Sequence, residues 1–106
     1  MKRVLLDHCV PRPLAALLTD AAVATAKQMG WTQLKNGELL AVAEAAGFEV
    51  LITSDKNLRY QQNLAARRIA IIELPTNRLS QLTQYAPLVN SLLVTVTPGT
   101  YEVLAP

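Results

Sequence analysis

Short aliphatic runs alternate with segments of helical period along the chain. The runs "RVLLD" (3–7), "FEVLIT" (48–53) and "IAIIEL" (69–74) place apolar residues side by side, a pattern typical of strands buried on both faces. Two shorter runs, "VATA" (23–26) and "TYEVL" (100–104), are further strand candidates. Strands that alternate with helices predict an α/β fold with a mostly parallel sheet.

Three segments between these runs carry apolar residues at the spacing of one helical face. The first spans residues 10–21, with prolines near its start, where proline fits a helix. The second has Asn36 as its expected N-cap and ends at Gly47, a usual position for glycine just past a helix. The third spans residues 79–93, and we expect Pro87 to kink or split it.

Two further segments have weaker patterns. Residues 27–37 are expected to form a loop, with Gly30 and Gly37 as breakers. The segment "NLRYQQNLA" (57–65) predicts a short helix whose apolar face is built from Leu58 and Leu64.

The bulk composition predicts one globular domain over residues 1–106. A chain with 51% hydrophobic and 17% charged residues is neither a disordered tail nor a coiled coil. Cys9 is the single cysteine, so no intramolecular disulfide is expected. Neither a secretory segment nor a membrane span is expected, and the chain is predicted to be cytoplasmic. A net charge of +2 is compatible with a polyanionic partner without requiring one.

Three carboxylates are the strongest candidates for chemistry. Asp7 and Asp55 follow predicted parallel strands, whose carboxyl ends form the edge where such sheets bind ligands. Glu38 lies in the first turn of the second helix, which can point toward the same edge. If the three converge, they form an oxygen-rich site suited to Mg²⁺ or Mn²⁺, which can activate water and neutralise a phosphodiester.

Each carboxylate also has a structural interpretation. Asp55 can cap the helix that follows it, and Glu38 can lie favourably at the positive end of a helix dipole. Asp7 ends a buried strand with no obvious helix to cap, because Pro11 begins the next helix too late. The combination of all three favours function over structure.

Other polar residues near this edge leave more than one interpretation open. His8 is a general base, a metal ligand or an ordinary surface residue, and Cys9 is more simply a small buried hydrophobe than a nucleophile. Trp31 either stacks on a base or anchors a loop. The basic residues near this edge or its following helix either contact phosphates or lie on solvated helix faces; they are Lys35, Lys56, Arg59, Arg67 and Arg68. The chain has no glycine-rich phosphate loop.

At "LLDH", "NGELL" and "LITSDKNL" the chain resembles the PIN-like domain family, specifically small bacterial proteins related to the toxin nucleases of toxin-antitoxin modules. The resemblance covers about the first three quarters of the chain, to Leu74. It implies a Rossmann-like PIN fold with helices on both faces of the sheet, and an Mg²⁺ or Mn²⁺ site for cutting RNA. The family's acidic positions correspond to Asp7, Glu38 and Asp55, and an antitoxin protein is an implied partner.

The chain departs from the family pattern at three points. Asn57 stands where many relatives have a second aspartate, and its amide oxygen can still coordinate a metal. His8 replaces an acid that often follows the first aspartate. The family commonly uses four acids, and the resemblance assigns the fourth to no residue here, although Glu73 ends a strand on the plausible side.

Two other function classes compete with a ribonuclease. A receiver domain also has acids after its first and third strands, but it needs a lysine after a late strand, and the last lysine here is Lys56. A non-catalytic PIN-like binding or dimerising module would keep the fold without the chemistry, and the apolar segment 88–104 would then cover the sheet edge or a second subunit. In the ribonuclease hypothesis the three acids bind the metal and Asn57 assists them. Lys35, Lys56 or Arg59 then contacts the substrate phosphate.

Overall fold

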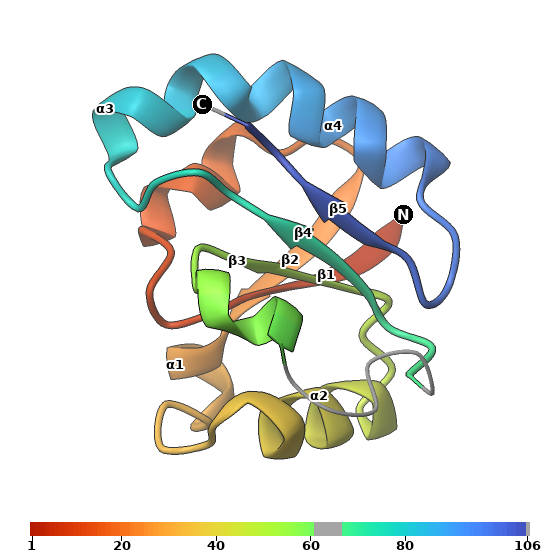
Figure 1. Cartoon of the computed structure of the whole chain (residues 1–106). Helices are drawn as coiled ribbons and strands as arrows, with labels where there is room; N and C mark the ends of the chain where they lie inside the picture. The colour runs from red at the N-terminus through yellow and green to blue at the C-terminus, as the bar shows by residue number, and fades with distance from the viewer. Residues whose placement is uncertain (61–66, 106) are drawn as a thin grey trace.

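A single parallel sheet forms the centre of the molecule (Figure 1). The computed structural model of the chain describes residues 1–60 and 67–105, apart from the side chain of Asn36. Within these residues the strands are Lys2–Leu6 (β1), Ala21–Thr25 (β2), Val50–Thr53 (β3), Ala70–Glu73 (β4) and Tyr101–Val103 (β5). They lie in the order β2-β1-β3-β4-β5, and each neighbouring pair is parallel. The α/β class and every predicted strand are therefore confirmed.

Seven helical segments connect the strands in the described part of the chain. The α-helices are Ala26–Met29 (α1), Asn36–Ala45 (α2), Leu79–Leu82 (α3) and Ala86–Thr95 (α4), and the 3₁₀ helices are Arg12–Leu17 (η1), Lys56–Tyr60 (η2) and Thr83–Tyr85 (η4). Gly47 follows α2 with a φ of 89°, as its predicted place beyond a helix end requires. The predicted split at Pro87 is confirmed, because η4 separates α3 from α4 and this proline stands in the first turn of α4. Among the described helices, none is long and apolar enough to cross a membrane.

The helix predicted over residues 10–21 is wrong in its extent. Only Arg12–Leu17 is helical, with 3₁₀ geometry, and Ala21 already pairs with Lys2 in the sheet. Leu17 is 37% exposed, so its apolar character reflects no buried helical face. Apolar spacing over so short a segment does not separate an α-helix from a 3₁₀ turn that leads into a strand.

The loop predicted over residues 27–37 is wrong in part. α1 occupies its start, because Thr25 and Gln28 form a capping box, and Gly37 lies inside the first turn of α2. Gly30 does act as a breaker, since it ends α1 with a φ of 76°. The helix predicted through Leu64 extends outside the described residues.

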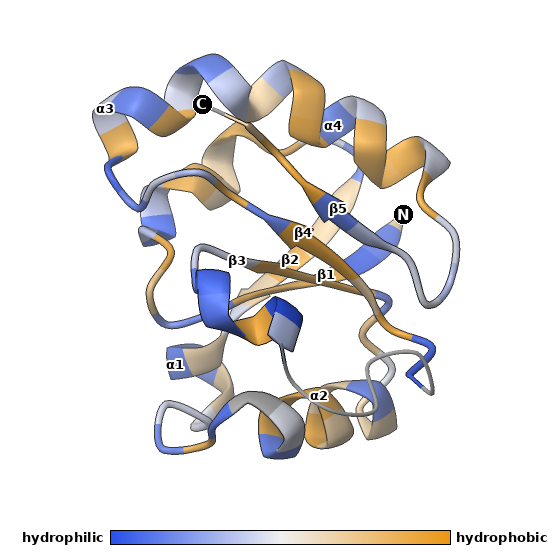
Figure 2. Cartoon of the chain, in the orientation of Figure 1, coloured by the Kyte–Doolittle hydropathy of each residue, from blue (hydrophilic) through white to orange (hydrophobic). Residues whose placement is uncertain are grey.

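Helices cover both faces of the sheet, as predicted. Successive side chains of a strand point to opposite faces, so Val4 and Leu6 lie in a cluster with residues of η1, α3 and α4, whereas Leu5 lies in a cluster with residues of α2 and η2. Figure 1 shows α3 and α4 along one face and α2 on the other. The strands are mostly apolar in Figure 2, whereas the helices carry both apolar and polar residues.

The chain reverses its direction across the sheet between β1 and β3. From β1 it passes to β2 at one edge, and it then returns to β3 on the other side of β1. η1, after β1, packs on one face, and η2, after β3, packs on the opposite face. Loops that diverge in this way open a crevice at the carboxyl ends of the two strands, where doubly wound sheets bind their ligands.

The last connection differs in hand from the others. The connections β1–β2 and β4–β5 run in opposite directions across the sheet, yet η1 and α4 pack on the same face. Two parallel connections with this arrangement must have opposite hands. The connections β2–β3 and β3–β4 differ from β1–β2 both in their direction across the sheet and in the face on which their helices pack, so all three have the same hand. The connection β4–β5 is therefore the exception to the nearly universal right-handed rule.

Candidate functional site

A pocket of about 260 Å³ lies at the carboxyl ends of β1 and β3. Asp7 and Asp55 both line it, together with His8 and Lys35. The remaining lining residues come from the segment before α2 and from α2 itself; they are Thr32, Gln33, Leu34 and Leu39. The pocket is therefore at the crevice that the strand order creates, where sequence reasoning placed the site.

Asp7 is held in place by its own neighbours. Its side chain is only 9% exposed, and Oδ1 lies 2.8 Å from the backbone nitrogen of His8, which donates to it, and 3.0 Å from Nδ1 of the same residue. Oδ2 accepts a hydrogen bond of 2.8 Å from the hydroxyl of Thr53 and lies 3.7 Å from Sγ of Cys9. The carboxylate thus has a fixed orientation at the end of β1, with protein donors on both oxygens.

Thr53 joins the two aspartates. Its hydroxyl donates to Asp7 and accepts a 3.0 Å hydrogen bond from the backbone N–H of Asp55, and its side chain is fully buried. Sequence reasoning missed this residue, although a threonine at the end of a buried apolar strand is a signal that its hydroxyl needs partners.

Replacing Thr53 by valine should lower the free energy of unfolding by about 1–3 kcal/mol, because the change keeps the shape but removes one donor and one acceptor from buried groups. Urea denaturation measures the loss. The matched control is the exposed Thr19, whose change to valine should stay within about 0.5 kcal/mol of the natural chain. Equal stability of the two variants would contradict the bridging role of Thr53.

Asp55 caps the helix that follows it. Its Oδ1 accepts a 2.9 Å hydrogen bond from the backbone N–H of Asn57, and its backbone carbonyl accepts one from Leu58. The structural interpretation of Asp55 is therefore confirmed. This role uses one carboxylate oxygen, and within the described residues the structure records no hydrogen bond to the other, so capping leaves room for a ligand.

The structure does not gather all three predicted acids. Glu38 is exposed in the first turn of α2 and does not line the pocket that Asp7 and Asp55 share. In residues 1–60 and 67–105, no three His, Cys, Asp or Glu side chains lie close enough together to hold one metal ion. What the fold brings together is a pair of carboxylates.

The three residues predicted to contact substrate, and Asn57, which was predicted to help hold the metal, have different surroundings. Lys35 lines the pocket, whereas Lys56 and Asn57 are exposed on η2. Arg59 is engaged within the protein, because Nε and Nη2 both donate to the carboxylate of Glu73. Of these four residues, Lys35 is the one placed beside both aspartates.

Glu73 is the centre of a buried network that sequence reasoning left unassigned. It ends β4 with 1% exposure, and its Oε1 lies 3.2 Å from Nε of Arg59 and 2.7 Å from the hydroxyl of Tyr101. The hydrogen bond to Glu73 raises the pKa of Arg59 above its ordinary value. Burial, followed by the hydrogen bond to Glu73, raises the pKa of Tyr101 well above its ordinary value. The network ties η2 and β5 to the end of β4.

The raised pKa of Tyr101 predicts a loss of stability in alkali. Above about pH 10 the unfolded chain releases the phenolic proton while the folded chain keeps it, so the unfolded state binds fewer protons and the free energy of unfolding falls as pH rises. Denaturation between pH 8 and 11 should show this fall in the natural chain and a smaller one in Tyr101→Phe. Tyr60→Phe, at a 77% exposed position, is the control and should behave like the natural chain. A slope unchanged in Tyr101→Phe would contradict the assignment.

Positive charge is concentrated at the carboxyl edge of the sheet. The segments that follow the strands there carry six of the ten basic residues, namely Arg12, Lys27, Lys35, Lys56, Arg59 and Arg78. The same edge has four of the eight acids, which are Asp7, Glu38, Asp55 and the last residue of β4, Glu73, and two of these, Asp7 and Glu73, are buried. The rest of the chain is balanced, so the whole formal surplus of two positive charges lies on the pocket side.

Comparisons with known proteins identify no family. No protein-family model matches the chain, and neither a curated protein nor a solved structure gives a significant match.

Proposed function

We propose that the chain is a divalent-metal-dependent ribonuclease that uses Asp7 and Asp55 to bind Mg²⁺ or Mn²⁺. The observation that supports this most is the shared pocket, which places both carboxylates and Lys35 at the crevice between β1 and β3. A cytoplasmic location is an expectation from the sequence pattern, and partnership with an antitoxin protein is an expectation from the resemblance to PIN-like domains.

The donor set fits magnesium in one of its usual modes. Mg²⁺ keeps several waters and binds proteins through one or two carboxylates plus substrate phosphates, so a carboxylate pair is sufficient. The capping role of Asp55 occupies only Oδ1, and its other oxygen is the natural ligand. Bound there, the ion would supply Lewis acidity and a more acidic water. Glu38 and Asn57 are not ligands in this proposal, because neither lines the pocket.

The basic residues define the substrate side of the proposal. Lys35 lines the pocket and can contact a phosphate next to the two aspartates. Lys56 is exposed on the neighbouring η2 and extends this surface. Because Arg59 already binds Glu73 through two nitrogens, we propose that it mainly holds η2, which Asp55 caps, in position.

A cleavage assay on one single-stranded RNA of mixed sequence, labelled at one end, tests the function. Cleavage should require Mn²⁺ or Mg²⁺, stop when EDTA is added, and be much weaker on DNA of the same sequence. The exposed Asp20 lies away from the pocket, so Asp20→Asn is the matched control and should cleave like the natural chain. Cleavage that persists in EDTA would overturn the proposal.

A non-catalytic binding module is the second candidate, and one observation favours it. Both oxygens of Asp7 already accept hydrogen bonds from His8 and Thr53, so the residue has a structural role without any metal. A module of this kind would bind RNA through Lys35 and Lys56 without cutting it. RNA binding that is unchanged by EDTA, together with intact RNA, would support this candidate over the nuclease.

A further inference from the structure

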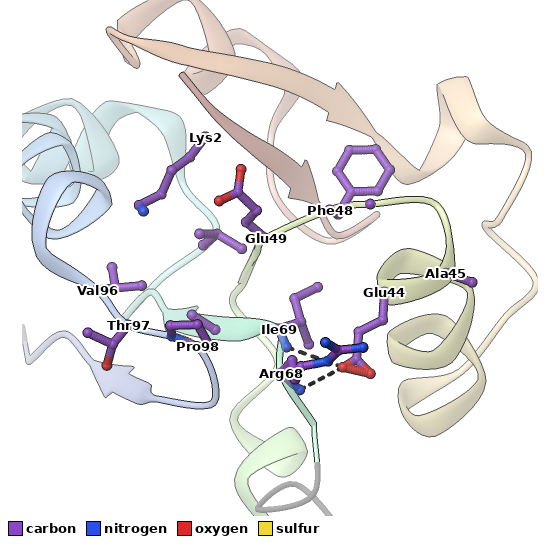
Figure 3. Close-up of a pocket in the computed structure, with 13 residues that line it drawn as sticks. Lys2, Glu44, Ala45, Phe48, Glu49, Arg68, Ile69, Val96, Thr97 and Pro98 are labelled. Atoms are coloured by element: carbon purple, nitrogen blue, oxygen red, sulfur yellow. Dashed lines mark hydrogen bonds between the residues drawn. The ribbon is translucent and has the colours of Figure 1, made fainter.

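We propose a second ligand site, for a small organic anion with an apolar body, at the opposite edge of the sheet from the two aspartates. A pocket of about 470 Å³ opens there beside the amino ends of β1, β3 and β4 (Figure 3). This volume is in the range of about 300–1,000 Å³ that small-molecule sites occupy. The site shares no lining residue with the carboxyl-edge pocket.

The inner surface of this pocket is apolar and close to fully buried. Phe48, Val50, Ile69 and Ala70 line it, and each is at most 5% exposed. Val96 and Pro98, which follow α4, form the opposing side. Val96 is partly exposed and Pro98 is exposed, so these two supply the accessible apolar surface, which favours the apolar body of a ligand over water.

Contacts with neighbouring side chains hold Phe48 in the wall of this pocket. The guanidinium of Arg3 lies 4.6 Å from the centroid of the Phe48 ring and donates to the backbone carbonyl of Ala46. The Phe48 ring also packs edge-to-face against the ring of Trp31, with 5.9 Å between the two ring centroids. Gly47 leaves space for the guanidinium of Arg3, because a Cβ at position 47 would lie 2.6 Å from Nη1 of that arginine. A preformed wall reduces the ordering that a ligand must otherwise impose.

The charges at the rim favour an anion. Glu44 is occupied, since Oε2 accepts from the backbone N–H groups of Arg68 and Ile69 and Oε1 pairs with Arg67 at 3.5 Å. The bonds from Glu44 to the two backbone nitrogens are drawn in Figure 3.

The two cations of the rim, by contrast, remain available. Glu49 also lines the pocket, accepts from the backbone N–H of Arg3 through Oε1 and keeps its negative charge, so with Glu44 paired to Arg67 the rim has one net positive charge. Lys2 and Arg68 both line the pocket, and among the described residues the structure records no ion pair or hydrogen bond for either side chain. A single carboxylate or similar group would balance the one net positive charge of this rim.

Three probes that share one ring and differ in charge test the site: benzoate, benzyl alcohol and benzylamine. Each is titrated into the ¹⁵N-labelled chain, and amide chemical shifts locate the binding. Benzoate should shift the signals of Gly47, Ile69 and Thr97, with binding at least about 5-fold tighter than benzyl alcohol, and benzylamine should bind more weakly than either. Equal binding of benzoate and benzyl alcohol, or shifts centred elsewhere, would overturn the proposal.

Charge-neutral variants separate this site from the proposed nuclease site. Lys2→Gln and Arg68→Gln should each weaken benzoate binding several-fold, whereas Lys27→Gln, on the carboxyl edge, should leave it unchanged. RNA cleavage should be the same in all of the amino-edge variants, so failure of either proposal leaves the other testable. Benzoate binding that ignores both substitutions would contradict the anion assignment.

Discussion

Replacing Asp55 by asparagine should abolish metal-dependent RNA cleavage and leave the fold intact. Asparagine caps helices as well as aspartate does, and its Oδ1 can still accept the hydrogen bond from Asn57. It lacks the charge that a hard cation requires. Cleavage should therefore fall by about 100-fold or more, beyond the 10- to 100-fold loss typical of residues that only support a metal ligand.

A second substitution at the same position separates capping from metal binding. Asp55→Ala removes both roles, so it should lose cleavage and also about 1 kcal/mol of stability, the usual cost of a lost cap. Stability is measured by urea denaturation and cleavage with the labelled RNA. An asparagine variant that retains cleavage, or loses it only because it unfolds, would contradict the assignment of Asp55 as a ligand.

The second large effect is expected at Arg59. Changing it to methionine keeps the aliphatic stem but leaves Glu73, which is 1% exposed, without its cation. Arg59 is itself partly exposed, so water screens part of its attraction to Glu73, but its removal leaves the buried Glu73 charge uncompensated and the free energy of unfolding should fall clearly. The hydroxyl of Tyr101 offsets only part of this loss for Glu73, since it supplies one hydrogen bond and no charge.

A double substitution supplies the control for Arg59. Glu73→Leu in the Arg59→Met background removes the stranded charge, and replacing both members of a buried pair by apolar groups is often neutral. The double variant should therefore be more stable than Arg59→Met alone in urea denaturation. If the double variant loses as much stability as Arg59→Met and Glu73→Leu lose separately, added together, then the two residues are not coupled and the network does not hold η2 to β4.

The sequence predicts the sheet well because its strands are buried on both faces. The run 69–74 has few structural alternatives to a central strand, because so many adjacent aliphatic residues need burial on both faces. The segment 10–21 is predicted poorly, because a short 3₁₀ turn and an α-helix share their apolar spacing over so few residues. The strand order and the unusual hand of the last connection depend on which strands pair, which local pattern does not determine.

The site is predictable only to the extent that it follows from parallel topology. Asp7 and Asp55 each follow a strand of one parallel sheet, so their presence at one edge follows from the fold class. Whether Glu38 joins them depends on how the first turn of α2 is oriented, and the structure leaves it outside the pocket. The pairing of Arg59 with Glu73 was missed because it requires η2 to lie against the end of β4.

Binding of Mn²⁺ followed by NMR tests the central claim most directly, because the paramagnetic ion broadens the signals of nuclei near it. Titrated into the ¹⁵N-labelled chain, Mn²⁺ should selectively broaden the amide signals of His8, Ser54 and Asp55, and Asp55→Asn should remove the effect. Broadening centred on Glu44 and Glu49 at the opposite edge, or no selective broadening at all, would contradict a metal site at Asp7 and Asp55.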